Sequence, residues 1–233
     1  MGGFDGLKIR RFSAAQSIAD LLRVQITNGE LPPLSRLIEA DLAEQLSISR
    51  TPLREALRQL ESEGFADRLP GGGLVVTGIN PEDVKELLWL RSVLEAAVVE
   101  EVTRIITPAE LDALDQRIEE MDLLRQHPQR FLDLGREFHD ALVGLLGNQR
   151  CQIVLRQVRS HVDRYWGVTT ARRPERTDFA SNQHREVVQL MRSGDALAAG
   201  AKMREHVLSE AEVCLETVRS LASEAGRSHE IAG

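Results

Sequence analysis

Three histidines occupy positions from which they could bind a common ligand. His139, His184 and His206 each lie on the apolar face of a different predicted helix, so each side chain would point inward. His184 and His206 are about equally far from the turn at residues 193–195, and a helical hairpin there would bring them to the same height. Neutral imidazole is a favoured zinc ligand. The spacing predicts a divalent metal site, with zinc favoured and nickel or manganese as alternatives; histidines that only stabilise a core are the competing interpretation.

A second group of residues is suited to DNA. Residues 38–46 and the segment that begins at Ser49 have the spacing of two short helices joined by a tight turn, and Ser49 is a good N-cap residue. Arg50, Thr51 and Arg54 fall on the face opposite the leucines of the second helix. A helix-turn-helix presents side chains to base edges and phosphates from this place. The pattern predicts a DNA-reading head.

The elements that position these side chains are mainly α-helical. A helix is expected over residues 13–27, and residues 65–77 read as strand, glycine-rich turn and strand, which is the pattern of a β-hairpin wing. Asn80 and Pro81 start a series of helices, expected over residues 81–104, 107–126, 128–146, 149–168, 175–193 and 195–224. We therefore predict a winged helix-turn-helix domain over residues 1–79, an antiparallel all-α bundle of about six helices over residues 80–225, and a flexible tail over residues 226–233.

Composition limits the class of protein. The chain has 233 residues, of which 42% are hydrophobic, and this length is enough for two domains. The net charge of −7 neither supports nor excludes DNA, because what matters is the local clustering of arginines, here Arg36, Arg50, Arg54, Arg58 and Arg68. No apolar run is long enough to span a bilayer, and the N-terminus lacks a signal-peptide pattern. We expect a cytoplasmic protein that makes no membrane contact.

A stretch of about 65 residues in the first half of the chain carries a family resemblance. The segments that carry it are Glu30-Leu31-Pro32-Pro33, Arg36-Leu37, Leu42-Ala43-Glu44, Ser49-Arg50-Thr51-Pro52-Leu53-Arg54-Glu55-Ala56-Leu57 and Leu60-Glu61-Ser62-Glu63-Gly64-Phe65. Their order and spacing resemble the winged-helix signature of GntR-family transcription regulators. The resemblance implies that double-stranded operator DNA is contacted by Arg36, Ser49, Arg50, Thr51 and Arg54, with Gly72 in the wing. Leu34 and Ser47 stand where the family usually has glycine.

The second half resembles the FadR-type ligand-binding domain, called FCD, that follows many GntR heads. The resemblance rests on Phe138-His139, Gly147-Asn148, His184-Arg185 and Met203-Arg204-Glu205-His206. In metal-binding members an aspartate one helical turn before the first histidine completes the ligand set, and here that place is Gly135. Asp133 is two residues out of register. The resemblance therefore implies three histidine ligands, with the fourth position left to water or effector.

Arg91 matches a helix of the same domain from which an arginine can approach the metal cavity. A guanidinium beside a metal with an open position suits a small carboxylate, which can bind both. The competing interpretation is an ordinary helix pair between Arg91 and Glu95 at i+4.

Together these features favour a regulator over an enzyme. We expect a homodimeric transcription factor, most simply a repressor, whose operator affinity is controlled by a small carboxylate effector. One alternative is a metal-dependent hydrolase built on the three histidines, which the lack of a His-Glu-x-x-His motif opposes. The other is a constitutive DNA binder whose histidines only hold the bundle together.

Overall fold

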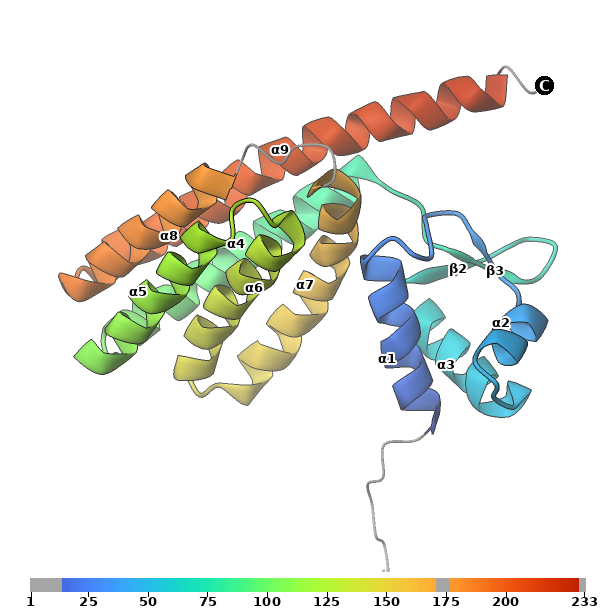
Figure 1. Cartoon of the computed structure of the whole chain (residues 1–233), viewed down its shortest axis with the longest axis horizontal. Coiled ribbons are helices and arrows are strands. Elements are labelled where there is room, and N and C mark those ends of the chain that lie inside the picture. The colour runs from blue at the N-terminus through green and yellow to red at the C-terminus, as the bar shows by residue number, and fades with distance from the viewer. Residues whose placement is uncertain (1–13, 171–176, 231–233) are drawn as a thin grey trace, which may run out of the picture. The chain divides into compact units, whose positions relative to one another are not determined.

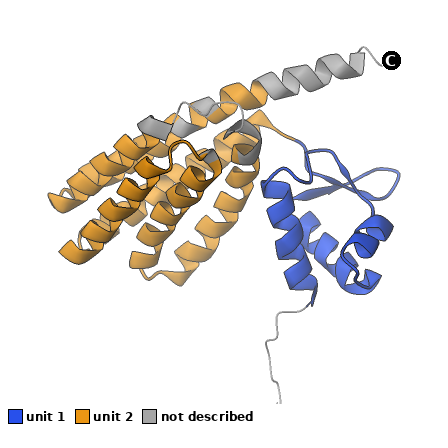
Figure 2. Cartoon of the chain, in the orientation of Figure 1, with its two compact units in different colours: residues 1–78 blue, residues 79–233 orange. Residues whose placement is uncertain are grey.

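The computed structural model describes residues 14–170 and 177–230, and the chain divides into two compact units, 1–78 and 79–233 (Figure 2). The predicted loose segment 1–10, most of the predicted break over 169–175 and residues 231–233 lie outside the described ranges. Each unit has a hydrophobic core of its own. The two units are therefore described separately.

Unit 1 is a helix-turn-helix with a small sheet (Figure 1). Its helices are α1 (Ala14–Thr27), α2 (Glu39–Gln45) and α3 (Arg50–Ser62), and its antiparallel strands β1 (Arg36–Leu37), β2 (Ala66–Arg68) and β3 (Leu74–Val76) have the order β1-β3-β2. Leu53, Leu57 and Leu60 bury one face of α3, which packs against α1. The predicted winged helix-turn-helix is confirmed, and the β2–β3 hairpin is its wing. Strand β1 was not predicted.

Two residues of unit 1 hold a backbone conformation that favours glycine. Leu34 has a φ of 65° and Ser47 a φ of 52°. These are the two positions where the sequence lacks the glycine that its motifs lead one to expect. A left-handed φ brings Cβ close to the following carbonyl oxygen and costs roughly 1–2 kcal/mol in a non-glycine residue. The turns keep their geometry at some cost in stability.

Replacing Ser47 by glycine is expected to stabilise unit 1. Relief of the left-handed strain is partly offset by the greater freedom of glycine in the unfolded chain, which leaves a net gain of about 0.5–1 kcal/mol. Thermal or denaturant unfolding of Ser47→Gly against wild type measures it. Ser62→Gly, an exposed change within helix α3, should instead destabilise by about 0.5–1 kcal/mol. A midpoint lowered by Ser47→Gly would contradict the strain.

Unit 2 is a bundle of six helices in the part of the chain that the structure describes. They are α4 (Pro81–Thr103), α5 (Pro108–Leu123), α6 (Pro128–Leu145), α7 (Gln149–Thr170), α8 (Thr177–Arg192) and α9 (Ala196–Glu230). The predicted all-α bundle is confirmed. Helix α9 continues past residue 225, where the bundle was expected to end.

Local hydrogen bonds explain where several of these helices begin. The Asn80 side chain accepts a hydrogen bond from the Glu82 backbone N–H at 3.0 Å, and Pro81 takes the first helical position of α4. Thr107 and Glu110 form a reciprocal capping box at the start of α5. Ser49 differs from expectation, because it takes the N-cap position of α3 without a side-chain capping bond.

Helix α4 lies at the centre of unit 2. It packs along α9 and also contacts α7, α6 and α8 (Figure 1). Its polar residues Arg91, Ser92 and Glu95 are consequently buried. Among residues 14–170 and 177–230, no helix combines the length and the apolar character needed to cross a membrane.

Candidate functional site

The three histidines meet inside unit 2. His139 comes from α6, His184 from α8 and His206 from α9, and all three are buried. Their Nε2 atoms form a triangle with sides of 3.3 Å (His139 to His184), 3.0 Å (His184 to His206) and 3.3 Å (His139 to His206). Zinc–nitrogen bonds of about 2.0–2.1 Å in a tetrahedron separate two ligand atoms by about 3.3 Å. The three nitrogens therefore have the separation expected of ligands to one ion.

The opposite ring nitrogens indicate which atoms carry the protons. His139 Nδ1 lies 2.7 Å from Oε2 of Glu95, and His206 Nδ1 lies 2.9 Å from Oε1 of Gln183. Both partners are acceptors, so both Nδ1 atoms are assigned the proton and both Nε2 atoms turn a lone pair towards the common point. Two lone pairs 3.3 Å apart repel each other unless a cation lies between them. The donor set fits a divalent metal.

Packing orients the third imidazole. The His184 ring stacks on Phe138, with ring centroids 4.3 Å apart and an interplanar angle of 23°. Its Nδ1 is buried and has no hydrogen-bond partner among the described residues. Phe138 therefore holds in place the one imidazole that lacks an acceptor behind it.

Burial sets the protonation states of the cluster. Desolvation lowers the pKa of His139, and it lowers the pKa of His184 and of His206 well below the ordinary range. Burial alone would raise the pKa of Glu95, but Arg91, His139 and Arg159 outweigh it and hold that pKa well below its usual value. At neutral pH the imidazoles are neutral and Glu95 is ionised, which are the states that metal binding requires.

Unit 2 is expected to lose stability as the pH falls from 7 to 5. Each buried histidine has a lower pKa in the folded state than in the unfolded state, so unfolding takes up protons and the histidine's contribution is lost below about pH 6.5. The loss approaches about 1.4 kcal/mol per pH unit for each histidine, and Glu95 adds a further loss below about pH 4.3. Thermal unfolding of chelator-treated protein across this range measures the slope. His184→Gln should flatten it, and a level profile for wild type would refute the assignment.

A cavity of about 70 Å³ adjoins the histidines. Apolar side chains form about half of its lining, and the rest combines two imidazoles, three guanidinium groups and one carboxylate: His139, His184, Arg91, Arg136, Arg159 and Asp163. Arg91 is buried, and its Nε donates to Oε1 of Glu95 at 3.0 Å. Arg91 therefore forms the expected i+4 pair and also lines the cavity. Both interpretations of this residue agree with its surroundings.

Arg159 also lines this cavity, although its sequence position gave no sign of a functional role. Its side chain on α7 is buried; Nε donates to Oε1 of Glu95 at 3.1 Å and Nη1 to Asp140. Its Nη2 is buried without a partner in the described part of the chain. Arg159 also borders a groove of about 340 Å³ between α6 and α7. A buried, unpaired guanidinium nitrogen is unfavourable, and an anion beside it would satisfy it.

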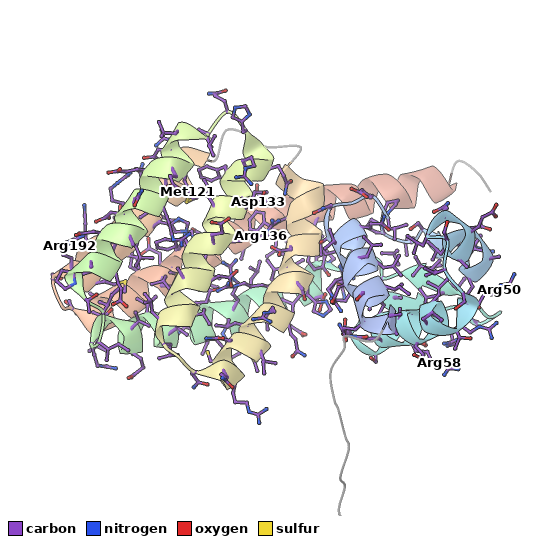
Figure 3. All side chains as sticks on the ribbon, turned by 60° about the horizontal axis from the view of Figure 1, so that its bottom comes forward. Arg50, Arg58, Met121, Asp133, Arg136 and Arg192 are labelled. Carbon is purple, nitrogen blue, oxygen red and sulfur yellow. The ribbon has the colours of Figure 1, made fainter. Side chains whose placement is uncertain are left out.

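Gly135 offers no ligand atom at the position where the resemblance placed a fourth metal ligand. It lines the cavity one helical turn before His139. A Cβ at this position would meet Met121 Cε at 3.6 Å, which is ordinary van der Waals contact. Asp133 does not substitute for the missing carboxylate, because its Oδ1 pairs with Arg136 at 2.6 Å (Figure 3 labels both residues and Met121).

Unit 1 gathers arginines along a groove of about 420 Å³ beside α3. The cations that line it are Arg36, Arg54, Arg58 and Arg68, and Gly72 and Gly73 of the wing complete the wall. They come from β1, α3, β2 and the β2–β3 turn, so the sheet brings the wing beside the second helix of the helix-turn-helix. Gly72 has a φ of 89°, and a Cβ added there would meet no atom within 4 Å, which suits a tip whose backbone approaches another molecule.

The remaining predicted DNA contacts lie at the start of α3. Ser49, Arg50 and Thr51 are exposed, and Figure 3 shows Arg50 and Arg58 directed away from the body of unit 1. Arg50 does not line the arginine groove. It is therefore placed to reach a partner beyond the groove.

Two carboxylates in unit 1 were not anticipated as partners of the arginine groove. Glu39 Oε2 lies 2.7 Å from Nε of Arg54, and Glu61 Oε2 lies 2.5 Å from Nη2 of Arg68. Both pairs are exposed to solvent, where such pairs are weak. A phosphate can therefore replace either carboxylate at small cost.

Comparison with known proteins identifies both units. Residues 14–76 match the family model for bacterial regulatory proteins of the gntR family, and residues 86–209 match that for the FCD domain. The chain belongs to the GntR family of transcription regulators. The resemblance found in the motifs is thereby confirmed for both halves of the chain. This GntR protein is a DNA-binding transcription regulator, and the relatives it matches are described as HTH-type transcriptional regulators and not as enzymes.

Alignments with known relatives cover most of the GntR protein. The Nta operon transcriptional regulator of Aminobacter aminovorans is 30% identical over 197 residues, which are 82% of this chain and 90% of that one. The HTH-type transcriptional repressor RspR of Escherichia coli K12 is 24% identical over 90% of both chains. The solved structure of E. coli McbR/YncC superposes with a TM-score of 0.75 at 21% identity, over 88% of this chain and 98% of that chain. At that identity the structural likeness supports the fold.

Proposed function

We propose that this GntR protein is a zinc-dependent, homodimeric repressor whose operator affinity is set by a small carboxylate. His139, His184 and His206 would hold the ion, and Arg91 with Arg159 would receive the carboxylate. The observation that carries the proposal is the triangle of Nε2 atoms, with sides of 3.0–3.3 Å, beside a cavity lined by buried guanidinium groups. The ion would supply a Lewis-acid position for one ligand oxygen. Nickel and manganese are the alternative metals.

The arginine groove and the start of α3 support a role in operator recognition. Arg36 and Arg54 line the groove, while Ser49, Arg50 and Thr51 lie exposed at the N-terminal end of the reading helix. This end of a recognition helix reaches base edges in the major groove of DNA. Gly72 at the wing tip would approach the adjacent minor groove. Such a regulator would act in the bacterial cytoplasm, where its DNA is.

Exposed apolar side chains on α4 and α7 support a homodimer. Trp89 is 56% exposed and Leu90 37% exposed on α4, and Ile153 and Val154 on α7 are 48% and 43% exposed. Large apolar groups at a surface favour burial against another protein. A second copy of the same chain would place two reading heads on the half-sites of a palindromic operator. The repressor RspR among the relatives supports repression as the output.

The test is whether a carboxylate changes operator affinity in the presence of zinc. An operator is selected from random duplex DNA with zinc-loaded protein, and mono-, di- and hydroxycarboxylates are then titrated against the complex. One class should change the affinity by about 5–150-fold, the usual range of allosteric coupling. The change should require zinc, and His184→Ala should abolish it while leaving operator binding in place.

Two results would contradict the proposal. If no carboxylate changes the operator affinity of the zinc-loaded protein, the protein is a constitutive DNA binder. The proposed metal site would be refuted if protein purified without chelator holds no divalent ion and added zinc does not raise its melting temperature.

A further inference from the structure

Glu95 contacts both halves of the proposed effector site at once. Its Oε1 accepts hydrogen bonds from Nε of Arg91 at 3.0 Å and Nε of Arg159 at 3.1 Å. Its Oε2 lies 2.7 Å from Nδ1 of His139, whose Nε2 belongs to the metal triangle. The carboxylate is 2% exposed, so water screens none of these contacts. One buried group therefore faces a metal ligand on one side and the two anion-binding arginines on the other.

We propose that Glu95 couples metal binding to anion binding, so that each ligand strengthens the binding of the other. The inference rests on the proposed function, because it needs both an ion at the histidines and an anion at the arginines. It adds a regulatory role for a residue that touches neither ligand. Glu95 is a positioning residue, and it acts through His139, Arg91 and Arg159.

The coupling follows from competition for a single charge. With the cavity free of anion, the negative charge of Glu95 is shared among His139, Arg91 and Arg159. An anion that pairs with the two guanidinium groups weakens their hold on Oε1 and leaves more of that charge for the His139 N–H. A carboxylate behind a ligating histidine raises the basicity of the imidazole, and losing such a partner lowers metal affinity about 10–100-fold. By thermodynamic reciprocity, a bound metal then favours the anion equally.

Glu95→Gln should therefore move the two affinities in opposite directions. The amide keeps the shape of the side chain but removes its charge, so zinc should bind about 10–100-fold more weakly. The two guanidinium groups lose their counter-charge at the same time, so acetate should bind the metal-free variant more tightly than it binds metal-free wild type. A purely structural role would weaken both affinities together.

Arg159→Gln is the reciprocal variant and leaves the Glu95 carboxylate buried beside Arg91. Without Arg159, more of the Glu95 charge is available to His139, so zinc should bind more tightly while acetate binds more weakly. This variant keeps the proposal testable if Glu95→Gln fails to fold. The Asp140 side chain, which loses its pair with Arg159, is 69% exposed, so water can hydrate it and the fold should be kept.

The experiment uses full-length, chelator-treated protein and two probes, zinc alone and acetate alone. Zinc affinity is measured by competition with a chromophoric chelator, with and without acetate, and acetate affinity by NMR titration. Acetate should raise the zinc affinity of wild type, and Glu95→Gln should reduce this enhancement. Glu86→Gln, an exposed change on the same helix, should match wild type in every measurement.

Two outcomes would overturn the coupling. One is a Glu95→Gln variant in which both affinities fall or neither changes while wild type binds both probes; this would leave the proposed function standing. The other is an equal loss of zinc affinity in Asp163→Asn, since Asp163 lines the cavity without pairing with a histidine, and overall charge would then be the cause. Failure of wild type to bind zinc would instead overturn the coupling and the proposed function together.

Discussion

Arg50→Ala is expected to lower operator affinity by at least 30-fold without changing the melting temperature. A good contact between an arginine and a base is worth about 1–3 kcal/mol, and a dimer with two reading heads loses it twice, about 2–6 kcal/mol in all. Arg50 is exposed at the first position of α3, so its removal leaves the core of unit 1 intact. Gel shift or fluorescence anisotropy on the selected operator measures the loss.

Arg54→Ala should reduce operator affinity as well, although by a different amount. In the free protein Arg54 pairs with the Glu39 carboxylate, and it must give up this ion pair to contact a DNA phosphate or base. The loss of that pair offsets part of the binding free energy that Arg54 contributes in the complex. Arg192→Ala is the matched control, because it removes an exposed arginine paired with Asp112 and Asp115 in unit 2. An Arg50→Ala variant that binds the operator as wild type does would show that Arg50 does not contact it. One that fails to fold would show that Arg50 supports the fold and is not a free surface residue.

Much of this architecture follows from local rules. The apolar spacing of Leu53, Leu57 and Leu60 predicts α3, and Asn80 with Pro81 predicts the start of α4, because both signals lie within a few residues of the element they define. Strand β1 has no such signal. Arg36 and Leu37 are extended because they pair with Val75 and Leu74 of the hairpin, and that pairing is fixed by the packing of the whole unit.

In the candidate metal site, too, some residues could be placed from the local sequence and others only from the packing of distant helices. His184 and His206 are related by a short hairpin, so their proximity follows from counting helical turns. His139 was selected because it lies on the inward face of its helix, and the family motif supports that choice; its distance from the other two depends on how α6 packs, which helical spacing leaves open. Arg159 was missed because nothing in its own helix distinguishes it from an ordinary surface arginine. Its burial comes from the contact of α7 with α4, where Glu95 meets it across 64 residues of chain.

Zinc is expected to stabilise unit 2, and His184→Ala is expected to remove that effect. An ion that binds only the folded chain contributes about 2.7 kcal/mol at a free concentration one hundred times its Kd, which raises the melting temperature by roughly 5–10 °C for a unit of this size. Thermal unfolding of chelator-treated protein, with and without zinc, measures the shift. His127→Ala, at an exposed histidine outside the cluster, should keep the full response.

Gly135→Asp should enlarge the zinc response further. The position faces the cavity one turn before His139 and has room for a Cβ, so an aspartate there can supply the carboxylate that the wild-type chain lacks. A fourth protein ligand closes the coordination sphere, and we expect zinc to bind on the order of tenfold more tightly. Without metal the same carboxylate is an extra buried charge, so the metal-free variant should melt lower than wild type.

Gly135→Ala separates the carboxylate from the backbone effect of the substitution. Alanine in place of glycine within a helix adds up to about 1 kcal/mol of stability with or without zinc, because it only restricts the unfolded chain and favours the helix. The aspartate variant should instead widen the gap between the zinc-loaded and metal-free melting temperatures beyond that of wild type. Equal gaps in the aspartate, alanine and wild-type proteins would mean that position 135 does not face the ion.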